Sequence, residues 1–117
     1  MSPFEPPGSP AAVPVVVVLV TAPDAETGAR LARSLVAEGL VACVNLVPEV
    51  RSIYRWQGEV QEETEVLLVM KTRADRLDIL AERVRALHPY ELPEVVALAA
   101  AGGSAPYLDW VRSEAAP

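Results

Sequence analysis

Residues 40–72 read LVACVNLVPEVRSIYRWQGEVQEETEVLLVMKT, two strand-like arms joined by Gln57-Gly58. The glycine supplies the positive φ that a tight hairpin turn requires, so we expect one long β-hairpin over Leu40–Trp56 and Glu59–Thr72. A strand of about 14 residues extends ~46 Å, whereas a domain of this size has a radius of gyration near ~13 Å. The hairpin is therefore expected to protrude beyond its own domain.

The two arms of this hairpin differ in their sequence pattern. In the first arm, Pro48 indicates an edge strand or a β-bulge, because proline cannot donate to a central ladder. In the second arm the residues before Glu65 are polar, and Val66–Met70 is continuously apolar. We therefore expect only the distal half of the second arm to be fully buried.

The segments around the hairpin predict two further strands and two helices. Val15–Val20 is a β-branched run without alternation, typical of a central strand, and Val95–Ala100 is a second apolar strand. A first helix is expected to begin after Asp24 as N-cap and to end at Gly39. A second helix is expected to follow residues 72–75, which have the form of a capping box, and to end at Leu87.

A short extra helix is expected at the C-terminal end, with Ser104 as its cap and with Tyr107 and Trp110 as the anchors that dock it. The whole order is β-α-β-β-α-β. It predicts an α+β domain of the ferredoxin-like split βαβ type, with four antiparallel strands and two helices on one face. A bare sheet face and a protruding ribbon favour a closed homo-oligomer, in which neighbouring subunits cover both.

Length and composition narrow the class of protein. The chain has 117 residues, enough for one domain, and a net charge of −6, which disfavours nucleic acid and anionic membranes as partners. A single cysteine, Cys43, excludes an internal disulfide and is expected to pack in the core. Apolar runs are too short to cross a bilayer and no secretory n-region is seen, so a cytoplasmic location is expected. Residues 1–14 hold five of the 11 prolines and predict a disordered leader before one domain over 15–117.

His88 is the only histidine and follows the predicted second helix. Its favoured role is structural, with Nδ1 bonded to one of the last helix carbonyls. Alternatively it is a metal ligand, with Glu91 and Glu94 as nearby oxygen donors.

A ligand cleft is the second candidate site, and its six candidate residues are Tyr54, Trp56, Lys71, His88, Tyr90 and Glu94. Tyr54 and Trp56 lie near the hairpin tip, where they either pack on a neighbouring subunit or line a cleft between subunits. Lys71 closes a buried strand, so its ammonium group needs a carboxylate or a carbonyl as partner. A salt bridge to Glu94 or Glu65, within or between subunits, is the structural role. If Lys71 instead points into the cleft with Trp56, His88 and Tyr90, the result is a pocket for an anion with aromatic walls.

Three blocks of sequence occur in an order that resembles one known family. They are residues 42–45 continuing to 52–58, the pair Lys71-Thr72, and residues 88–94 followed by 107–110. Together they resemble the CutA divalent-cation-tolerance family from about Val15 to Val111. The resemblance implies a ferredoxin-like subunit in a tight homotrimer, similar to the trimeric PII-type signalling proteins. It also implies a link to copper and other divalent cations, with no reaction firmly attached.

The copper position of that family is only partly present. The resemblance places copper on a cysteine before the Thr-Ala-Pro turn and on two adjacent histidines before Pro-Tyr. The corresponding residues are Val20, Leu87 and His88. Valine and leucine have no lone pair for a metal, so copper is expected to bind weakly here if it binds at all.

Three functions remain open from the sequence. The favoured one is a trimeric binding or regulatory protein without catalysis, associated with divalent cations. The second is a small-molecule enzyme or ligand sensor with a site between subunits, in which Lys71 stabilises charge and His88 acts as acid and base. The third is a structural or anchoring trimer.

Overall fold

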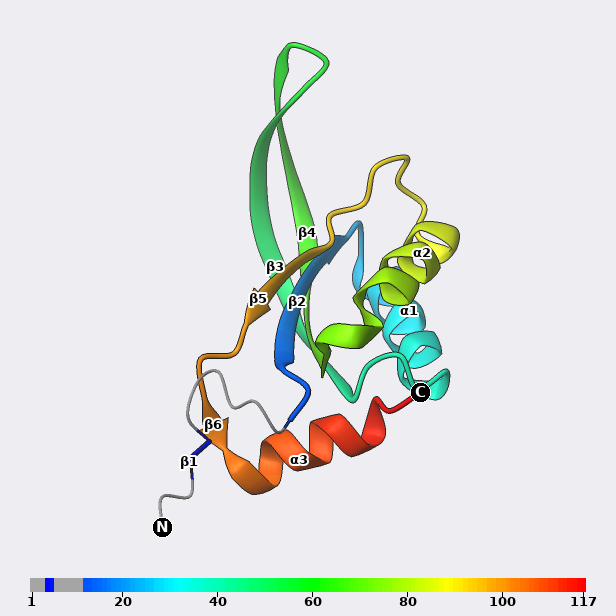
Figure 1. The fold of residues 1–117 in the computed structure, drawn as a ribbon. Helices are drawn as coiled ribbons and strands as arrows, with labels where there is room; N and C mark the ends of the chain where they lie inside the picture. Colours follow the sequence, from blue (N-terminus) through cyan, green and yellow to red (C-terminus); the bar gives the residue numbers. More distant parts are fainter. Residues whose placement is uncertain (1–3, 6–11) are drawn as a thin grey trace.

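The protein is described by a computed structural model over residues 4–5 and 12–117 (Figure 1). Its elements are β1 (Phe4–Glu5), β2 (Val15–Ala22), α1 (Ala25–Ala37), β3 (Cys43–Trp56), β4 (Glu59–Arg73), a 3-10 helix (Ala74–Arg76), α2 (Leu77–Leu87), β5 (Val96–Ala99), β6 (Gly103–Ser104) and α3 (Ala105–Glu114). The order and the bounds of the predicted hairpin, of the two further strands and of the first two helices are confirmed to within a few residues.

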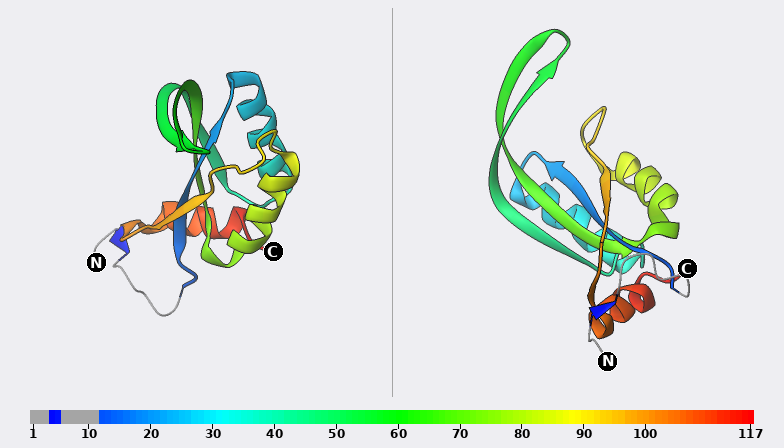
Figure 2. Two further views of the ribbon diagram at one scale, coloured as in Figure 1. Left: turned by 90° about the horizontal axis from the view of Figure 1, so that it is seen from above. Right: turned by 60° about the vertical axis from the view of Figure 1, so that its left-hand side comes forward.

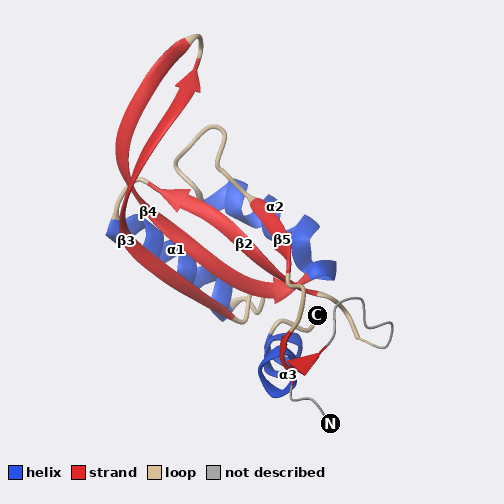
Figure 3. Ribbon diagram, turned by 90° about the vertical axis from the view of Figure 1, so that its left-hand side faces the viewer, coloured by secondary structure: helices blue, strands red, loops and turns tan. Residues whose placement is uncertain are grey.

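A four-stranded antiparallel sheet in the order β3-β4-β2-β5 forms the centre of the domain. Helices α1 and α2 both cover the same face of this sheet, and Figure 3 looks onto the opposite face. The predicted α+β domain, with its two helices on one side of an antiparallel sheet, is confirmed. The helix-covered side holds the core, in which Leu35, Leu68, Met70, Leu80 and Val84 are fully buried.

The uncovered face of the sheet is apolar. In the β2–β5 register Val96 lies opposite Leu19 and Leu98 opposite Val17, and these four side chains share that face. Val96 and Leu98 are about half exposed, although apolar side chains on a central sheet are usually covered. The expected bare sheet face is therefore present in the single chain.

The hairpin β3–β4 extends far beyond the sheet, as Figure 1 and the right-hand view of Figure 2 show. The molecule measures 51 × 25 × 23 Å and has a radius of gyration of 15.3 Å, so the predicted overhang is confirmed. Gln57 and Gly58 both have positive φ at the turn. The pairing shifts register between Val47 and Val50, which confirms the bulge expected at Pro48.

Helix α1 begins and ends where the sequence predicts. The Asp24 carboxylate accepts a hydrogen bond from the Thr27 N–H at 2.7 Å, and Gly39 follows the helix with φ of +71°. This positive φ is the left-handed conformation in which a helix commonly terminates.

The predicted capping box at residues 72–75 is wrong. Thr72 lies within β4, fully buried, and its hydroxyl donates to the Leu40 carbonyl at 2.7 Å. Asp75 pairs instead with Arg73 at 2.7 Å. The strand runs on past Thr72 because that buried hydroxyl finds a carbonyl on the segment after α1, and the helix starts later through a 3-10 turn.

The buried anchors of α3 are not the predicted Tyr107 and Trp110. Tyr107 and Trp110 remain half exposed, and Leu108 and Val111 are the buried residues, packed with Val15. Leu108 and Val111 are three positions apart and share the helix face that meets the sheet end, while the two aromatic rings flank it. Ser104 is the N-cap by position, but its side chain makes no capping hydrogen bond.

The expected leader is described only in part. Phe4–Glu5 pairs with β6 in a small antiparallel ladder. The carbonyls of Val13 and Pro14 accept hydrogen bonds from the Arg112 side chain and the Ala74 N–H. For these described residues the prediction of a disordered leader is wrong, because they are bonded to the fold. Residues 1–3 and 6–11 lie outside the described part of the chain, so for them it stays a prediction.

Candidate functional site

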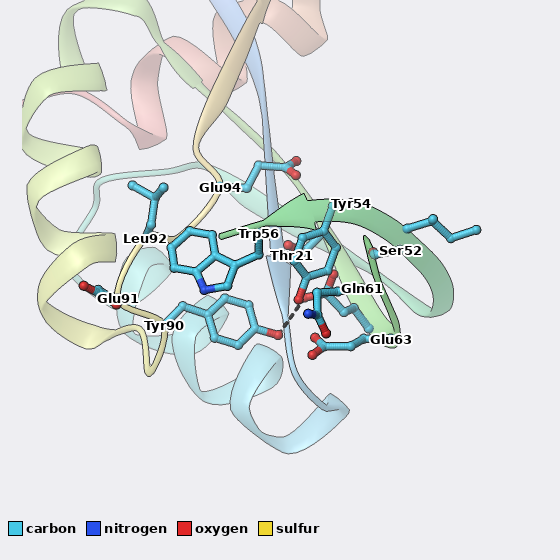
Figure 4. Close-up of a pocket in the computed structure, with 12 residues that line it drawn as sticks. Thr21, Ser52, Tyr54, Trp56, Gln61, Glu63, Tyr90, Glu91, Leu92 and Glu94 are labelled. Atoms are coloured by element: carbon cyan, nitrogen blue, oxygen red, sulfur yellow. Dashed lines mark hydrogen bonds between the residues drawn. The ribbon is translucent and has the colours of Figure 1, made fainter. Parts of the chain in front are cut away.

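A cleft of about 800 Å³ lies between the base of the hairpin and the loop that joins α2 to β5 (Figure 4). Its volume is in the range of small-molecule sites. The hairpin contributes Tyr54, Trp56, Glu63 and Glu65, and the loop contributes the rest of its charged and aromatic lining, Tyr90, Glu91 and Glu94. The hairpin is held by the β3–β4 ladder, and the loop is held by hydrogen bonds of His88 and Tyr90.

The register of the hairpin gathers the side chains of its cleft-facing side. Ser52 lies opposite Glu63, and Tyr54 lies opposite Gln61. Because residues two apart on a strand point to the same face, these four residues and Glu65 lie on one side of the ribbon. Glu65 occupies the base of the hairpin and is only 5% exposed.

The loop from residue 88 to residue 94 is held against the sheet by His88 and Tyr90. The buried His88 ring bonds to the Thr21 carbonyl through Nε2 at 2.7 Å. Its Nδ1 accepts a hydrogen bond from the Tyr90 N–H at 3.1 Å, so Nε2 is the protonated donor of a neutral ring. The Tyr90 hydroxyl then donates to Glu65 Oε2 at 2.6 Å and ties the loop to the hairpin.

The cleft is strongly acidic. None of the described residues that line it is basic, and four of them are glutamates. Burial raises the pKa of Glu94, and the charge of Glu65 adds to this increase. Burial also raises the pKa of both tyrosines, Tyr54 next to Glu63 and Tyr90 next to Glu65.

Lys71 does not line this cleft, so the alternative in which it points into an anion pocket is not met within the single chain. It donates instead to Asn45 Oδ1 on the uncovered sheet face. No ion pair of Lys71 with Glu65 or Glu94 occurs within the described part of the chain. Within the single chain, the carboxylates of the cleft therefore have no Lys71 ammonium group beside them.

The structure brings together four of the six predicted cleft residues: Tyr54, Trp56, Tyr90 and Glu94 line it. His88 lies behind the lining, with its ring centroid 4.6 Å from that of Tyr90. Glu63 and Gln61 were missed as site residues. Their alternation with Glu65 in the second arm is the signal that could have placed them on the side of Tyr54.

Cys43 is partly exposed rather than fully in the core. Its Sγ lies 3.5 Å from the Tyr107 hydroxyl on α3. This contact and burial raise the pKa of Tyr107 to about 12. The thiol therefore joins the sheet to the last helix and is remote from the cleft lining.

Comparison with known proteins places this geometry in a family. The family model described as CutA1 divalent ion tolerance protein matches residues 16–114. The chain belongs to the CutA1 divalent ion tolerance family. The family resemblance stated from the sequence is thereby confirmed.

Individual relatives agree with this assignment. The "Divalent-cation tolerance protein CutA" of Thermus thermophilus is 55% identical over 96 residues, which are 82% of this chain and 93% of that protein. The rice "Protein CutA 1, chloroplastic" is 50% identical over 101 residues, 86% of this chain. The match covers 57% of the rice protein, so the chain spans little more than half of that relative.

Solved structures of the family share the fold. The crystal structure of CutA1 from Oryza sativa superposes with a TM-score of 0.84 at 50% identity, over 87% of this chain and 94% of that one. The Thermus thermophilus structure gives 0.84 at 53% identity, over 86% and 97% of the two chains. None of the described helices is long and apolar enough to cross a membrane.

The residues at the expected copper position do not fit a copper ion. Val20 is fully buried in the core, and Leu87 offers no donor atom. Both ring nitrogens of His88 are already used, one by Thr21 and the other by Tyr90. In the described part of the chain no three His, Cys, Asp or Glu side chains stand together as a metal site.

Proposed function

We propose that this chain is a non-catalytic binding or regulatory protein that works as a cytoplasmic homotrimer, built from a ferredoxin-like subunit, in the response to divalent cations. The observation that carries the proposal is the cleft, whose lining offers carboxylates and aromatic rings to a ligand. Membership of the divalent ion tolerance family supports the cation association. Lys71 and His88, to which the enzyme hypothesis gave the catalytic roles, both lie outside the lining of the cleft.

The trimer is supported by the uncovered sheet face. Val96 and Leu98 on β5 are half exposed beside Val17 and Leu19, and an apolar face of this kind is usually covered by another surface. β5 is also an edge strand with free backbone groups. Further copies of the chain, arranged around a closed ring, would cover both features.

Native mass spectrometry of the full chain, purified without a metal-affinity step, tests the assembly. We expect a trimer that Leu98→Glu dissociates, because the new charge would be buried against a neighbour. Ile79→Glu is the matched control, since Ile79 on α2 is 50% exposed and Leu98 is 52% exposed. A monomeric wild type, or equal behaviour of the two variants, contradicts the proposed assembly.

The same sample tests the cation association by titration with copper and then with zinc. Metal uptake in a fixed ratio to the trimer supports the proposal. A trimer that stays metal-free at micromolar copper and zinc contradicts it. In that case the family fold would be present here without metal binding.

A further inference from the structure

We propose that the cleft binds an organic ammonium cation, held by carboxylates at its base and by aromatic rings at its walls. This inference rests on the proposed binding role and names the chemical class of the ligand. It follows from the charge, the ring content and the size of the cleft.

The charge of the cleft is unbalanced. Glu63, Glu65, Glu91 and Glu94 belong to its lining, and none of the described lining residues is Lys, Arg or His. Glu65 is 5% exposed, and its hydrogen-bond partner is the neutral Tyr90 hydroxyl. A buried carboxylate that has a donor but no counter-charge is costly, and a bound cation removes that cost.

The rings of the cleft suit an ammonium group rather than a bare ion. Tyr54, Trp56 and Tyr90 all line it, with Trp56 reaching in from the hairpin and Tyr90 from the loop (Figure 4). The face of an aromatic ring attracts an ammonium group, and tryptophan does so most strongly. Tyr54 and Trp56 are each more than a third exposed, so their rings are accessible to a ligand in the single chain.

The size and the donor set of the cleft argue against a metal ion. A volume of about 800 Å³ suits a molecule with several carbon atoms. A divalent metal needs several donors on one point, and no such group of three occurs among the described side chains. The glutamates are instead spread over the hairpin and the loop. This spacing suits an extended organic cation better than a single metal ion.

Fluorescence titration of the full chain tests the proposal. The protein has two tryptophans, and Trp110 lies on α3 away from the cleft. In Trp110→Phe, Trp56 is the single reporter. The probes are choline, spermidine and the uncharged isostere of choline in which carbon replaces the ammonium nitrogen. We expect at least one of the two cations to shift the Trp56 emission at millimolar concentration, and the isostere to leave it unchanged.

Substitutions then locate the binding site by calorimetry. Glu65→Gln keeps an acceptor for Tyr90 and removes the charge, and Glu94→Gln removes a second charge at the loop. We expect each to weaken binding about tenfold, since a charge-assisted contact is lost. Trp56→Leu should weaken it several-fold through the lost ring face. Glu82→Gln on the exposed side of α2 is the matched control and should bind as wild type.

The outcomes separate this inference from the proposed function. Equal binding of choline and its isostere, or binding of neither cation by the assembled protein, overturns the ammonium site. Saturable zinc or copper binding that is lost in Glu94→Gln assigns the cleft to a metal and also overturns it. A metal-binding trimer without ammonium binding leaves the proposed function standing, whereas a monomer in native mass spectrometry removes the proposed function by itself.

Discussion

The Tyr90 hydroxyl donates to Glu65 Oε2 at 2.6 Å, across a gap of 25 residues in sequence. Tyr90 lies on the loop after α2, and Glu65 lies at the base of the protruding hairpin. This hydrogen bond links the two walls of the cleft. The relative position of the walls therefore depends on one hydroxyl and one buried carboxylate.

Tyr90→Phe is expected to lower the free energy of unfolding by about 1–3 kcal/mol, because the buried Glu65 carboxylate loses its donor. Urea denaturation at fixed protein concentration measures the change. Tyr107→Phe is the control, since the contact of the Tyr107 hydroxyl with Cys43 Sγ, at 3.5 Å, is a weak hydrogen bond. Equal stability of Tyr90→Phe and wild type would show that the contact does not stabilise the fold.

His88→Phe keeps a buried ring and removes both ring nitrogens. We expect a loss of about 2 kcal/mol, since the Thr21 carbonyl and the Tyr90 N–H each lose a hydrogen bond. Any uptake of copper by the trimer should stay unchanged, because neither nitrogen is free for a metal in the wild type. Loss of copper binding with unaltered urea denaturation would instead identify His88 as a ligand.

Thr72→Val is nearly isosteric and leaves the Leu40 carbonyl without the hydroxyl that bonds it at 2.7 Å. We expect a loss of about 1–2 kcal/mol in unfolding free energy. Asp75→Asn should cost less, because the ion pair of Asp75 with Arg73 is partly exposed. Equal losses in the two variants would favour the capping box that the structure replaces.

The stability of the protein should depend on pH through Glu94, which lines the cleft. Burial and the charge of Glu65 raise the pKa of Glu94, so the folded state holds this proton more tightly than the unfolded state. The contribution of Glu94 to stability therefore falls as pH rises from the ordinary glutamate range through the raised pKa. Glu94→Gln removes the group that titrates. The unfolding free energy of this variant relative to wild type should therefore rise between the ordinary glutamate pKa and the raised pKa of Glu94, and then stay constant.

Urea denaturation across a pH series measures this difference. Asp24→Asn supplies a control of opposite sign, because the hydrogen bond from Thr27 lowers the pKa of Asp24. The wild-type advantage over Asp24→Asn should be present above the ordinary aspartate range and be lost as pH falls through the lowered pKa. A flat difference between Glu94→Gln and wild type would contradict a raised pKa at Glu94.

Features that depend on local sequence were predictable. The turn at Gln57-Gly58, the cap at Asp24 and the apolar run of β2 each follow from the conformational preference of a few adjacent residues. The bulge at Pro48 follows in the same way, since a missing N–H forces a local departure from the ladder. These features together determine the order of the elements.

Side-chain partners across the fold were not predictable from the same patterns. Thr72 has the spacing of a cap, yet its hydroxyl bonds a carbonyl 32 residues earlier. Lys71 has several acidic partners in the sequence, and only the register of the sheet shows that Asn45 is its neighbour. The sequence therefore left open whether the cleft would bind an anion, because the position of one lysine depends on tertiary pairing.

The register shift near Pro48 has an electrostatic consequence. Before the shift, odd-numbered residues of β3 lie opposite odd-numbered residues of β4, as Cys43 does with Lys71. After the shift, even-numbered residues of β3 lie opposite odd-numbered residues of β4, as Tyr54 does with Gln61. After the shift Arg51 lies opposite Thr64 and Arg55 lies opposite Val60. Both arginines therefore lie on the side of the ribbon that faces away from Glu63 and Glu65. The pairing beyond the bulge thus keeps the basic side chains of β3 off the cleft, and the electrostatic potential there stays negative.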